Sequence, residues 1–435
     1  MKQPTRRHFM KGACAFAGAS VAWPLIVPDT VFGAEAPSER ITIGCIGTGR
    51  MGQGDMRSVL GFKQARIVAV CDVDSARATD AQQIVQRQYK SDNCCDAYQD
   101  FRLLVARRDI DAVMICTPDH WHAVPAIAAA KAGKDIFLQK PLTLTIHEGR
   151  VLSDTVRRYG RVFQVGSQQR SDQRFRFACE LVRNGRIGKV QAVHVGFGYD
   201  PGCAEEPGTA PPPNLDYEMW LGQAPKKPYT EKRVHPQKGY DRPGWLRIRD
   251  YGHGMITGWG SHHLDIAQWG LGTMDSGPVE VECREVEFPN KGLWDVHGKF
   301  SLEYTYANGV RMTCADDTKN KPGILFEGNA GWVYVTRGAI DANPKSLLQE
   351  KIGPNEIQLY KSDNHFGNWL QCIKTRAETV APVEHGHRSC TICLLGSIAM
   401  SLRRKLRWDP AKEQFVGDSE ADSMCKREAR SPWAV

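Results

Sequence analysis

The chain has 435 residues, of which 41% are hydrophobic and 24% are charged, and its formal net charge at pH 7 is +8. This length and composition indicate a globular protein with room for two domains, without low-complexity tracts or internal repeats. The basic residues are scattered rather than gathered in a stripe, which argues against a nucleic-acid partner and leaves open a mildly positive cleft for acidic sugars.

The first 36 residues have the features of an export signal. Residues 5–11 read TRRHFMK, a twin-arginine pattern, and an apolar run over residues 13–31 precedes small residues that suit cleavage. Pro24 and Pro28 interrupt this run, so its longest apolar part is shorter than the roughly 20 residues of a membrane-spanning helix. We therefore expect residues 1–36 to engage the twin-arginine export machinery and the mature protein to be periplasmic.

Residues 40–74 have the layout of a dinucleotide-binding site. An apolar strand leads into Gly47-x-Gly49-x-x-Gly52, and a helix-length segment then leads to a second apolar strand that ends at Asp72. Gly47 permits the tight turn, Gly49 lets the backbone approach a diphosphate, and Gly52 lets helix and strand pack closely. Asp72 is expected to accept hydrogen bonds from the adenosine ribose and to repel a 2′-phosphate, which favours NAD over NADP.

Strands and helices alternate through the next hundred residues. Strands are predicted over 111–116, 135–138 and 161–165, and helices over 75–89, 98–106 and 146–159. This alternation predicts a Rossmann domain over residues 37–165, with a doubly wound parallel sheet in which ligands gather beyond the carboxyl ends of the strands. Thr117, Pro118 and His122 follow one of these strands, and Gln139 with Lys140 follows the next, so we expect both segments at the site.

From residue 189 the pattern changes to strands with alternating apolar residues. They are predicted over 190–197, 279–288, 298–306, 311–315, 324–327 and 332–336. The alternation indicates an open, mainly antiparallel sheet with one covered face, in a C-terminal α+β domain over residues 166–435. A Pro- and Gly-rich insertion at 201–254 has the length of a lid, an oligomer arm or a substrate wall. Helices are predicted over 174–184 and 262–271, and two more over 365–405.

Lys140 and His262 are the candidate catalytic residues. A lysine at the carboxyl end of a Rossmann strand can hydrogen-bond a reacting hydroxyl and stabilise the developing alkoxide. His262 has an ordinary pKa of about 6.5, which suits proton removal from a sugar hydroxyl. Asp265 lies three residues further along the same helix face and is the expected orienter of His262. Adjacent histidines, His262 and His263, cannot share one face, so we expect no metal site.

Aromatic and basic residues gather in the insertion and around it. They suit either stacking on sugar rings and binding of hydroxyls or carboxylates, or packing of a lid or an oligomer interface, and both interpretations stay open. They are Trp121, Tyr199, Trp220, Tyr240, Trp245, Arg247, Arg249 and Tyr251.

Together these motifs resemble the Gfo/Idh/MocA oxidoreductases, most closely the exported bacterial members. The likeness covers almost the whole chain after the leader and rests on Gly47-Thr48-Gly49-Arg50-Met51-Gly52, Thr117-Pro118, Lys140-Pro141 and Ser261-His262-x-x-Asp265. It implies hydride transfer between NAD(P) and a sugar or cyclitol, a homo-oligomer formed through the open sheet, and catalytic positions for Lys140 and His262. The residues expected around the cofactor are Gly47, Gly49, Arg50, Met51, Gly52, Asp72, Thr117, Pro118, His122, Gln139 and Lys140.

Two positions depart from the family's pattern. Gln139 replaces the glutamate of a Glu-Lys-Pro motif, and Gly258 stands where many members carry an aspartate four residues before the histidine. Three functions therefore remain open. The first is an exported oxidoreductase that keeps its NAD tightly bound. The others are an NAD-dependent glycosidase or lyase acting by transient oxidation and elimination, and a non-catalytic sugar-binding protein.

Overall fold

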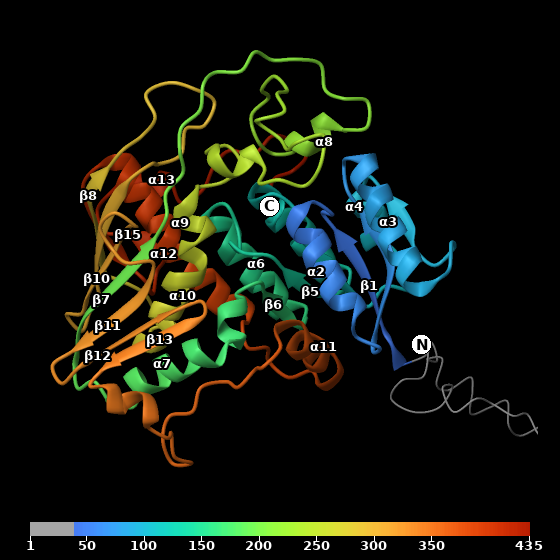
Figure 1. Cartoon of the computed structure of the whole chain (residues 1–435). Helices are drawn as coiled ribbons and strands as arrows, with labels where there is room; N and C mark the ends of the chain where they lie inside the picture. The colour runs from blue at the N-terminus through green and yellow to red at the C-terminus, as the bar shows by residue number, and fades with distance from the viewer. Residues whose placement is uncertain (1–38) are drawn as a thin grey trace, which may run out of the picture. The chain divides into compact units, whose positions relative to one another are not determined.

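Two β-sheets form the framework, and the second begins where the sequence pattern changes near residue 189 (Figure 1). This computed structural model describes residues 39–435. The leader predicted over residues 1–36 lies outside the described residues, so the export signal stays a prediction. Within the described part, no helix has the length and apolar character needed to cross a membrane.

The first sheet is parallel and has six strands in the order β3-β2-β1-β4-β5-β6. Its strands are β1 (Ile41–Ile46), β2 (Ala65–Cys71), β3 (Asp96–Tyr98), β4 (Ala112–Ile115), β5 (Asp135–Leu138) and β6 (Phe163–Val165). The helices between them are α2 (Arg50–Leu60), α3 (Ser75–Tyr89), α4 (Phe101–Val105), α5 (Ala123–Lys131) and α6 (Ile146–Arg158). The doubly wound fold is confirmed, and its strand order reverses between β1 and β4, where a ligand crevice opens.

The second sheet has nine strands in the order β13-β12-β11-β7-β10-β9-β8-β14-β15. They are β7 (Val190–Phe197), β8 (Glu280–Val286), β9 (Phe300–Thr305), β10 (Arg311–Asp316), β11 (Gly323–Gly328), β12 (Trp332–Thr336), β13 (Ala339–Asn343), β14 (Lys405–Asp409) and β15 (Gln414–Phe415). Only β7 and β10 pair in parallel among these neighbours, because β7 is inserted between β10 and β11. The mainly antiparallel sheet is thus confirmed.

Helices cover one face of the second sheet. Along β9, Phe300, Leu302 and Tyr304 are buried while the residues between them are partly exposed. The covering helices are α7 (Gln173–Arg183), α10 (Gly260–Leu271) and α12 (Val383–Leu402). Because α12 also packs on α6, one apolar core runs from the second sheet into the Rossmann sheet. Figure 1 shows the opposite face of the second sheet without such a layer.

The remaining short elements lie around these layers. They are the 3₁₀ turns η4 (Asp119–Trp121), η5 (Gln168–Ser171), η6 (Gly244–Arg247) and η7 (Lys345–Gln349), and the helices α8 (Tyr217–Leu221), α9 (Met255–Gly258), α11 (His365–Thr375) and α13 (Ser419–Ser423). The insertion at 201–254 packs on a small apolar core of its own. The main chain of the insertion also forms hydrogen bonds with the residues that follow β2. Ser75 N donates to Asn214 O at 2.8 Å, and Asp216 N donates to Val73 O at 3.0 Å.

Candidate active site

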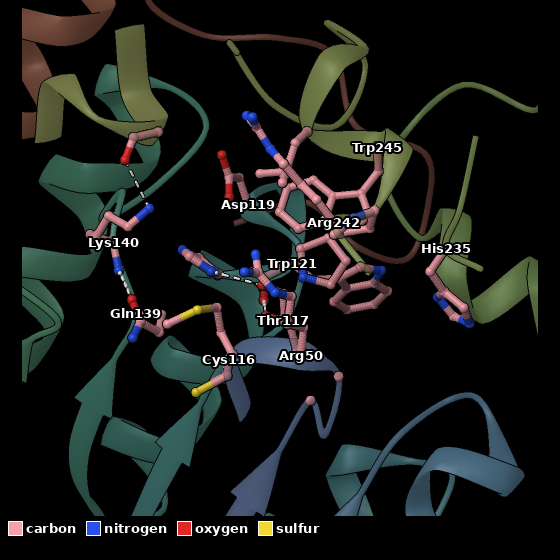
Figure 2. Close-up of a pocket in the computed structure, with 18 of the residues that line it drawn as sticks. Arg50, Cys116, Thr117, Asp119, Trp121, Gln139, Lys140, His235, Arg242 and Trp245 are labelled. Carbon is pink, nitrogen blue, oxygen red and sulfur yellow. Dashed lines mark hydrogen bonds between the residues drawn. The ribbon is translucent and has the colours of Figure 1, made fainter. Parts of the chain in front are cut away.

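A cleft of about 860 Å³ opens beyond the carboxyl ends of the Rossmann strands (Figure 2). Its walls come from the strand ends, from the insertion, and from α9, α10 and the turn between β12 and β13. The predicted site residues that line it are Gly47, Gly49, Arg50, Met51, Asp72, Thr117, Pro118, His122, Gln139, Lys140 and His262. Gly52 and Asp265 do not line it. The ends of the Rossmann strands and the first turn of α10 therefore meet at this cleft.

The glycine-rich loop has the geometry that a diphosphate requires. Gly47 has a φ of +82°, and a Cβ on Gly52 would lie 2.0 Å from the carbonyl oxygen of Gly47, so neither position accepts a side chain. Helix α2 begins at Arg50, and its N-cap residue, Gly49, provides no side-chain hydrogen bond. The first N–H groups of α2 are thus left for an anion at the cleft. These residues fit a dinucleotide.

Asp72 lines the cleft just after the end of β2. Its Oδ2 accepts from Thr48 N at 2.8 Å and its Oδ1 from Asp74 N at 3.0 Å, which holds the carboxylate at the end of β2. The insertion reaches the same place, because His235 lines the cleft and its Nε2 lies 3.0 Å from Asp74 Oδ2. The insertion is therefore fastened beside the position expected for the ribose.

His122 is held by main-chain oxygens rather than left free for a nucleotide. Its Nδ1 lies 2.6 Å from Pro141 O and its Nε2 lies 3.0 Å from Thr117 O. Burial lowers the pKa of His122 to about 4, so the ring is neutral and its single N–H donates to only one of these two oxygens. Its side chain thus joins the loop after β4 to the turn that carries Lys140.

Gln139 connects Lys140 to a buried acid that the sequence did not single out. Gln139 Nε2 donates to Asp55 Oδ2 at 2.7 Å, while Gln139 Oε1 accepts from Lys140 N at 3.1 Å. Burial raises the pKa of Asp55, on α2, to about 6, although hydrogen bonds from Gln139 and Cys116 oppose the change. Position 139 thus lacks the carboxyl group of the family's glutamate, but the carboxyl group of Asp55, on α2, lies next to it.

Lys140 presents its ammonium to the cleft beside Asp119, as Figure 2 shows. Lys140 Nζ donates to Gly258 O at 2.9 Å. Burial lowers the pKa of Lys140, and the charges of Arg337 and Arg242 lower it further, whereas Asp119 opposes this. Burial in turn raises the pKa of Asp119 to about 7 against the effect of Lys140. The pair can therefore accept and release a proton near neutral pH.

His262 lines the same cleft from the first turn of α10. Its Nδ1 is buried and has no hydrogen-bond partner in the described part of the chain. Its ring meets Trp259 edge-on, with 5.9 Å between centroids. Burial lowers the pKa of His262 well below its ordinary value, and the charges of Lys140 and Arg337 act in the same direction. The ring is therefore neutral.

The structure corrects the expectation that Asp265 orients His262. Asp265 accepts hydrogen bonds from Arg170 Nε at 2.8 Å, from Arg170 Nη2 at 2.9 Å and from Ser389 Oγ at 2.6 Å. All three donors lie on the side of α10 that faces η5 and α12. Asp265 is a buried structural residue, and the charged groups that act on His262 are Lys140 and Arg337.

Three charged residues near Lys140 were not predicted. Asp119 stands within the motif at 117–122 but was not singled out, whereas Arg242 comes from the insertion and Arg337 from the turn between β12 and β13. No local pattern marks the last two, because only the packing of distant segments brings them to the cleft. Among the aromatic residues, Trp121, Trp220 and Trp245 line the cleft, and Tyr199, Tyr240 and Tyr251 do not.

Two family models match this chain. One, described as an oxidoreductase family with an NAD-binding Rossmann fold, matches residues 41–167. The other, described as the C-terminal alpha/beta domain of an oxidoreductase family, matches residues 187–435. Both are Gfo/Idh/MocA models, and together they span the two sheets described above.

Individual relatives match over shorter stretches. Inositol 2-dehydrogenase of Rhizobium meliloti is 34% identical over 160 residues, which are 36% of this chain and 44% of that protein. Glycosyl hydrolase family 109 protein 1 of Shewanella sp. (strain ANA-3) is 29% identical over 201 residues, covering 42% of this chain and 44% of that protein. The chain thus spans less than half the length of these two curated relatives.

A solved structure shares the fold over most of the chain. The WlbA dehydrogenase from Bordetella pertussis, in complex with NADH and UDP-GlcNAcA, superposes with a TM-score of 0.62 at 16% identity, covering 85% of this chain and 99% of that chain. At this identity the likeness concerns the fold alone.

Proposed function

The chain belongs to the Gfo/Idh/MocA oxidoreductase family and carries its NAD-binding Rossmann domain, and from this premise we propose that it transfers a hydride between NAD and a hydroxyl-bearing carbon of a sugar or cyclitol. The observation that carries the proposal is that Lys140 and His262 line one cleft with the glycine-rich loop. NAD, when bound, supplies the hydride acceptor.

The residues at the strand ends bind and orient the dinucleotide. The N–H groups at the start of α2 meet the diphosphate, and Asp72 accepts hydrogen bonds from the ribose hydroxyls. The carboxylate of Asp72 disfavours a 2′-phosphate, so NAD is preferred to NADP. The insertion covers the adenosine end through His235 and Asp74, and we propose that it keeps the cofactor bound.

Lys140 and His262 handle the proton. Oxidation of a hydroxyl releases a hydride, with both electrons of the C–H bond, and one proton from oxygen. Burial lowers the pKa of Lys140 and of His262 and so favours the neutral form of each, and we propose that one of these two nitrogens accepts that proton. Lys140 then donates a hydrogen bond to the developing oxyanion, and the carboxylate of Asp119 balances the positive charge of Lys140.

Export and assembly belong to the same proposal. A twin-arginine leader at residues 1–36 would deliver the protein to the periplasm already folded around its cofactor. The open face of the second sheet would mediate a homo-oligomer. Cofactor retention suits a compartment in which free NAD is scarce.

A second candidate function is glycoside cleavage through transient oxidation. It is supported by the match to a glycosyl hydrolase family 109 protein. The same pair, Lys140 and His262, would move the protons: the aglycone would leave by elimination, water would add to the resulting double bond, and the hydride would then return to the sugar. Product analysis separates the candidates, because only cleavage releases a free sugar without net formation of NADH.

The test begins with the mature protein purified without added nucleotide. Mass spectrometry of the denatured protein should detect NAD or NADH, and a sugar panel should produce NADH absorbance. Lys140→Met should keep the nucleotide and lower kcat by roughly 100- to 10,000-fold. Lys131→Met, at an exposed lysine in α5, is the matched control. Equal turnover by Lys140→Met and Lys131→Met would exclude Lys140 from catalysis.

A further inference from the structure

Arg337 extends into the cleft from a part of the chain far from the Rossmann motifs. It lies in the turn between β12 and β13 and lines the cleft with Lys140 and His262. Its positive charge lowers the pKa of both. Its side chain is exposed to the solvent that fills the cleft.

Among the described residues, Arg337 has no carboxylate bound directly to it, unlike Arg174 and Arg242, which also line the cleft. Arg174 is paired with Asp172 at 2.7 Å, and Arg242 is paired with Asp200 at 3.0 Å. Within residues 39–435, no carboxylate lies within 4.0 Å of the Arg337 guanidinium, and the charge of Asp172, which is paired with Arg174, acts on it from farther away. A guanidinium with no carboxylate bound directly to it, next to a proposed reaction site, is a suitable position for an anion.

Two neighbours hold this guanidinium in place. It lies over the ring of Trp259, 4.5 Å from the centroid. The side-chain amide of Gln169 is oriented so that its nitrogen donates to His262 O at 3.1 Å and its oxygen accepts from Arg337 Nε at 3.3 Å. This leaves the two terminal nitrogens available for a bidentate contact. Gln169 also links the position of Arg337 directly to the main chain of His262.

We propose that Arg337 binds the carboxylate of an acidic sugar, a hexuronate or an aldonate, while Lys140 and His262 contact a hydroxyl of the same molecule. This inference rests on the hydride transfer proposed above and names its substrate class. The planar fork of one guanidinium matches one carboxylate. Arg174 and Arg242 already have carboxylate partners, so neither competes with Arg337 for the acid.

The experiment compares acidic and neutral sugars of matched shape. The mature protein is assayed with glucuronate against glucose, galacturonate against galactose, and gluconate against glucitol, by NADH absorbance and by isothermal titration calorimetry. Arg337→Met removes the charge and keeps much of the length. Arg87→Met, at an exposed arginine on α3 that donates to a main-chain oxygen, is the control. Both variants are first checked for bound nucleotide and for thermal stability.

The wild type should prefer the acidic member of at least one pair. Arg337→Met should weaken binding of that acid by roughly 10- to 100-fold in Kd and leave its neutral partner and Arg87→Met unchanged. Equal use of acidic and neutral sugars, use of neutral sugars alone, failure of every acid to bind, or an unchanged Kd in Arg337→Met would overturn the proposal. Acid binding that depends on Arg337 without NADH formation would support the carboxylate subsite and contradict the proposed hydride transfer.

Discussion

The guanidinium of Arg170 binds the carboxylate of Asp265 through two hydrogen bonds of 2.8 and 2.9 Å. Each of these two side chains is only 2% exposed to solvent. A third hydrogen bond, from Ser389 at 2.6 Å, joins α12 to the same carboxylate. The aspartate three residues after the candidate base therefore holds α10 between η5 and α12.

This pairing predicts a stability effect for Asp265→Ala. The substitution leaves Arg170 charged, buried and unpaired, so the free energy of unfolding should fall by about 3–5 kcal/mol. Urea unfolding followed by tryptophan fluorescence measures it. Asp275→Ala, at an aspartate whose side chain is 89% exposed, should stay near wild type. A variant with unchanged stability and a 100-fold lower kcat would instead restore Asp265 as the orienter of His262.

The contact between Gln139 and Asp55 makes a second prediction. Gln139→Glu places a second carboxylate where an amide now donates to Asp55 at 2.7 Å. Because the pKa of Asp55 is raised to about 6, its carboxyl is protonated below that pH and can donate to the new glutamate. We therefore expect the free energy of unfolding of Gln139→Glu to be about 1–3 kcal/mol lower than that of wild type at pH 8, and this difference to be smaller at pH 5.

The double variant Asp55→Asn with Gln139→Glu is the control for that experiment. It exchanges the amide and the carboxylate, so the hydrogen bond can form again with a single negative charge. Its stability at pH 8 should recover toward wild type. A loss in Gln139→Glu that is independent of pH and is not rescued would show that shape, rather than charge, selects glutamine there.

The sequence was sufficient to predict the parts that depend on neighbouring residues. The strand ending at Asp72, the glycine-rich turn and the alternating strands of the second sheet all show local periodicity, and the structure has them. The parallel pairing of β7 with β10 has no local signal, because the chain between them is long. The partner of Asp265 was missed for the same reason. Helix geometry fixes which residues share a face, but Arg170 comes from another element.

The site shows the same division. Lys140 follows a strand and could be found by its position, whereas Arg337 lines the cleft through contacts with Trp259 and Gln169, which lie far from it in the sequence. Asp55 was hidden because a carboxylate within a helix reads as a solvated residue. Asp55 is bonded to Cys116 and Gln139, which follow β4 and β5, and the spacing of residues does not encode that contact.

Removal of the Asp119 carboxylate should change the pH dependence of turnover. The charge of Asp119 raises the pKa of Lys140 and opposes the effect of burial, so Asp119→Asn should lower the pKa of Lys140 further. Oxidation requires a neutral lysine, and the acid limb of kcat/KM should therefore move to lower pH. Steady-state kinetics between pH 5 and 9 test this, with Asp275→Asn as the control. An acid limb that stays in place would remove this coupling from the mechanism.

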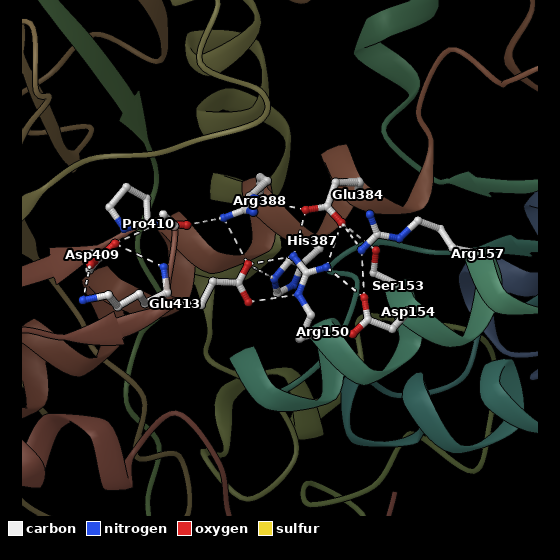
Figure 3. Close-up of polar contacts among 12 residues, drawn as sticks. Arg150, Ser153, Asp154, Arg157, Glu384, His387, Arg388, Asp409, Pro410 and Glu413 are labelled. Carbon is white, nitrogen blue, oxygen red and sulfur yellow. Dashed lines mark hydrogen bonds and ion pairs between the residues drawn. The ribbon is translucent and has the colours of Figure 1, made fainter.

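A polar network joins α6 of the Rossmann domain to α12 and to the turn before β15 (Figure 3). Arg150 Nη2 donates to Glu384 Oε1 at 2.8 Å and to Glu413 Oε1 at 2.7 Å. His387 Nε2 lies 2.8 Å from Glu413 Oε1, and Ser153 Oγ donates to Glu384 Oε2 at 2.7 Å. The network therefore links the two halves of the chain through charged groups.

Glu384→Gln should weaken this link and flatten the acid dependence of stability. Burial alone would raise the pKa of Glu384, but hydrogen bonds from Arg150 and Ser153 and the charge of Arg150 lower it to about 2. A depressed carboxyl pKa contributes stability that is present above the unfolded value of about 4.3 and is lost as pH falls toward 2. The free energy of unfolding of the variant should be about 1–3 kcal/mol lower than that of wild type at pH 7. It should also decline less steeply than that of wild type between pH 5 and 2. Urea unfolding at several pH values measures both, with Glu378→Gln, at an exposed glutamate, as the control. A decline as steep as that of wild type would show that other carboxyl groups carry the acid sensitivity.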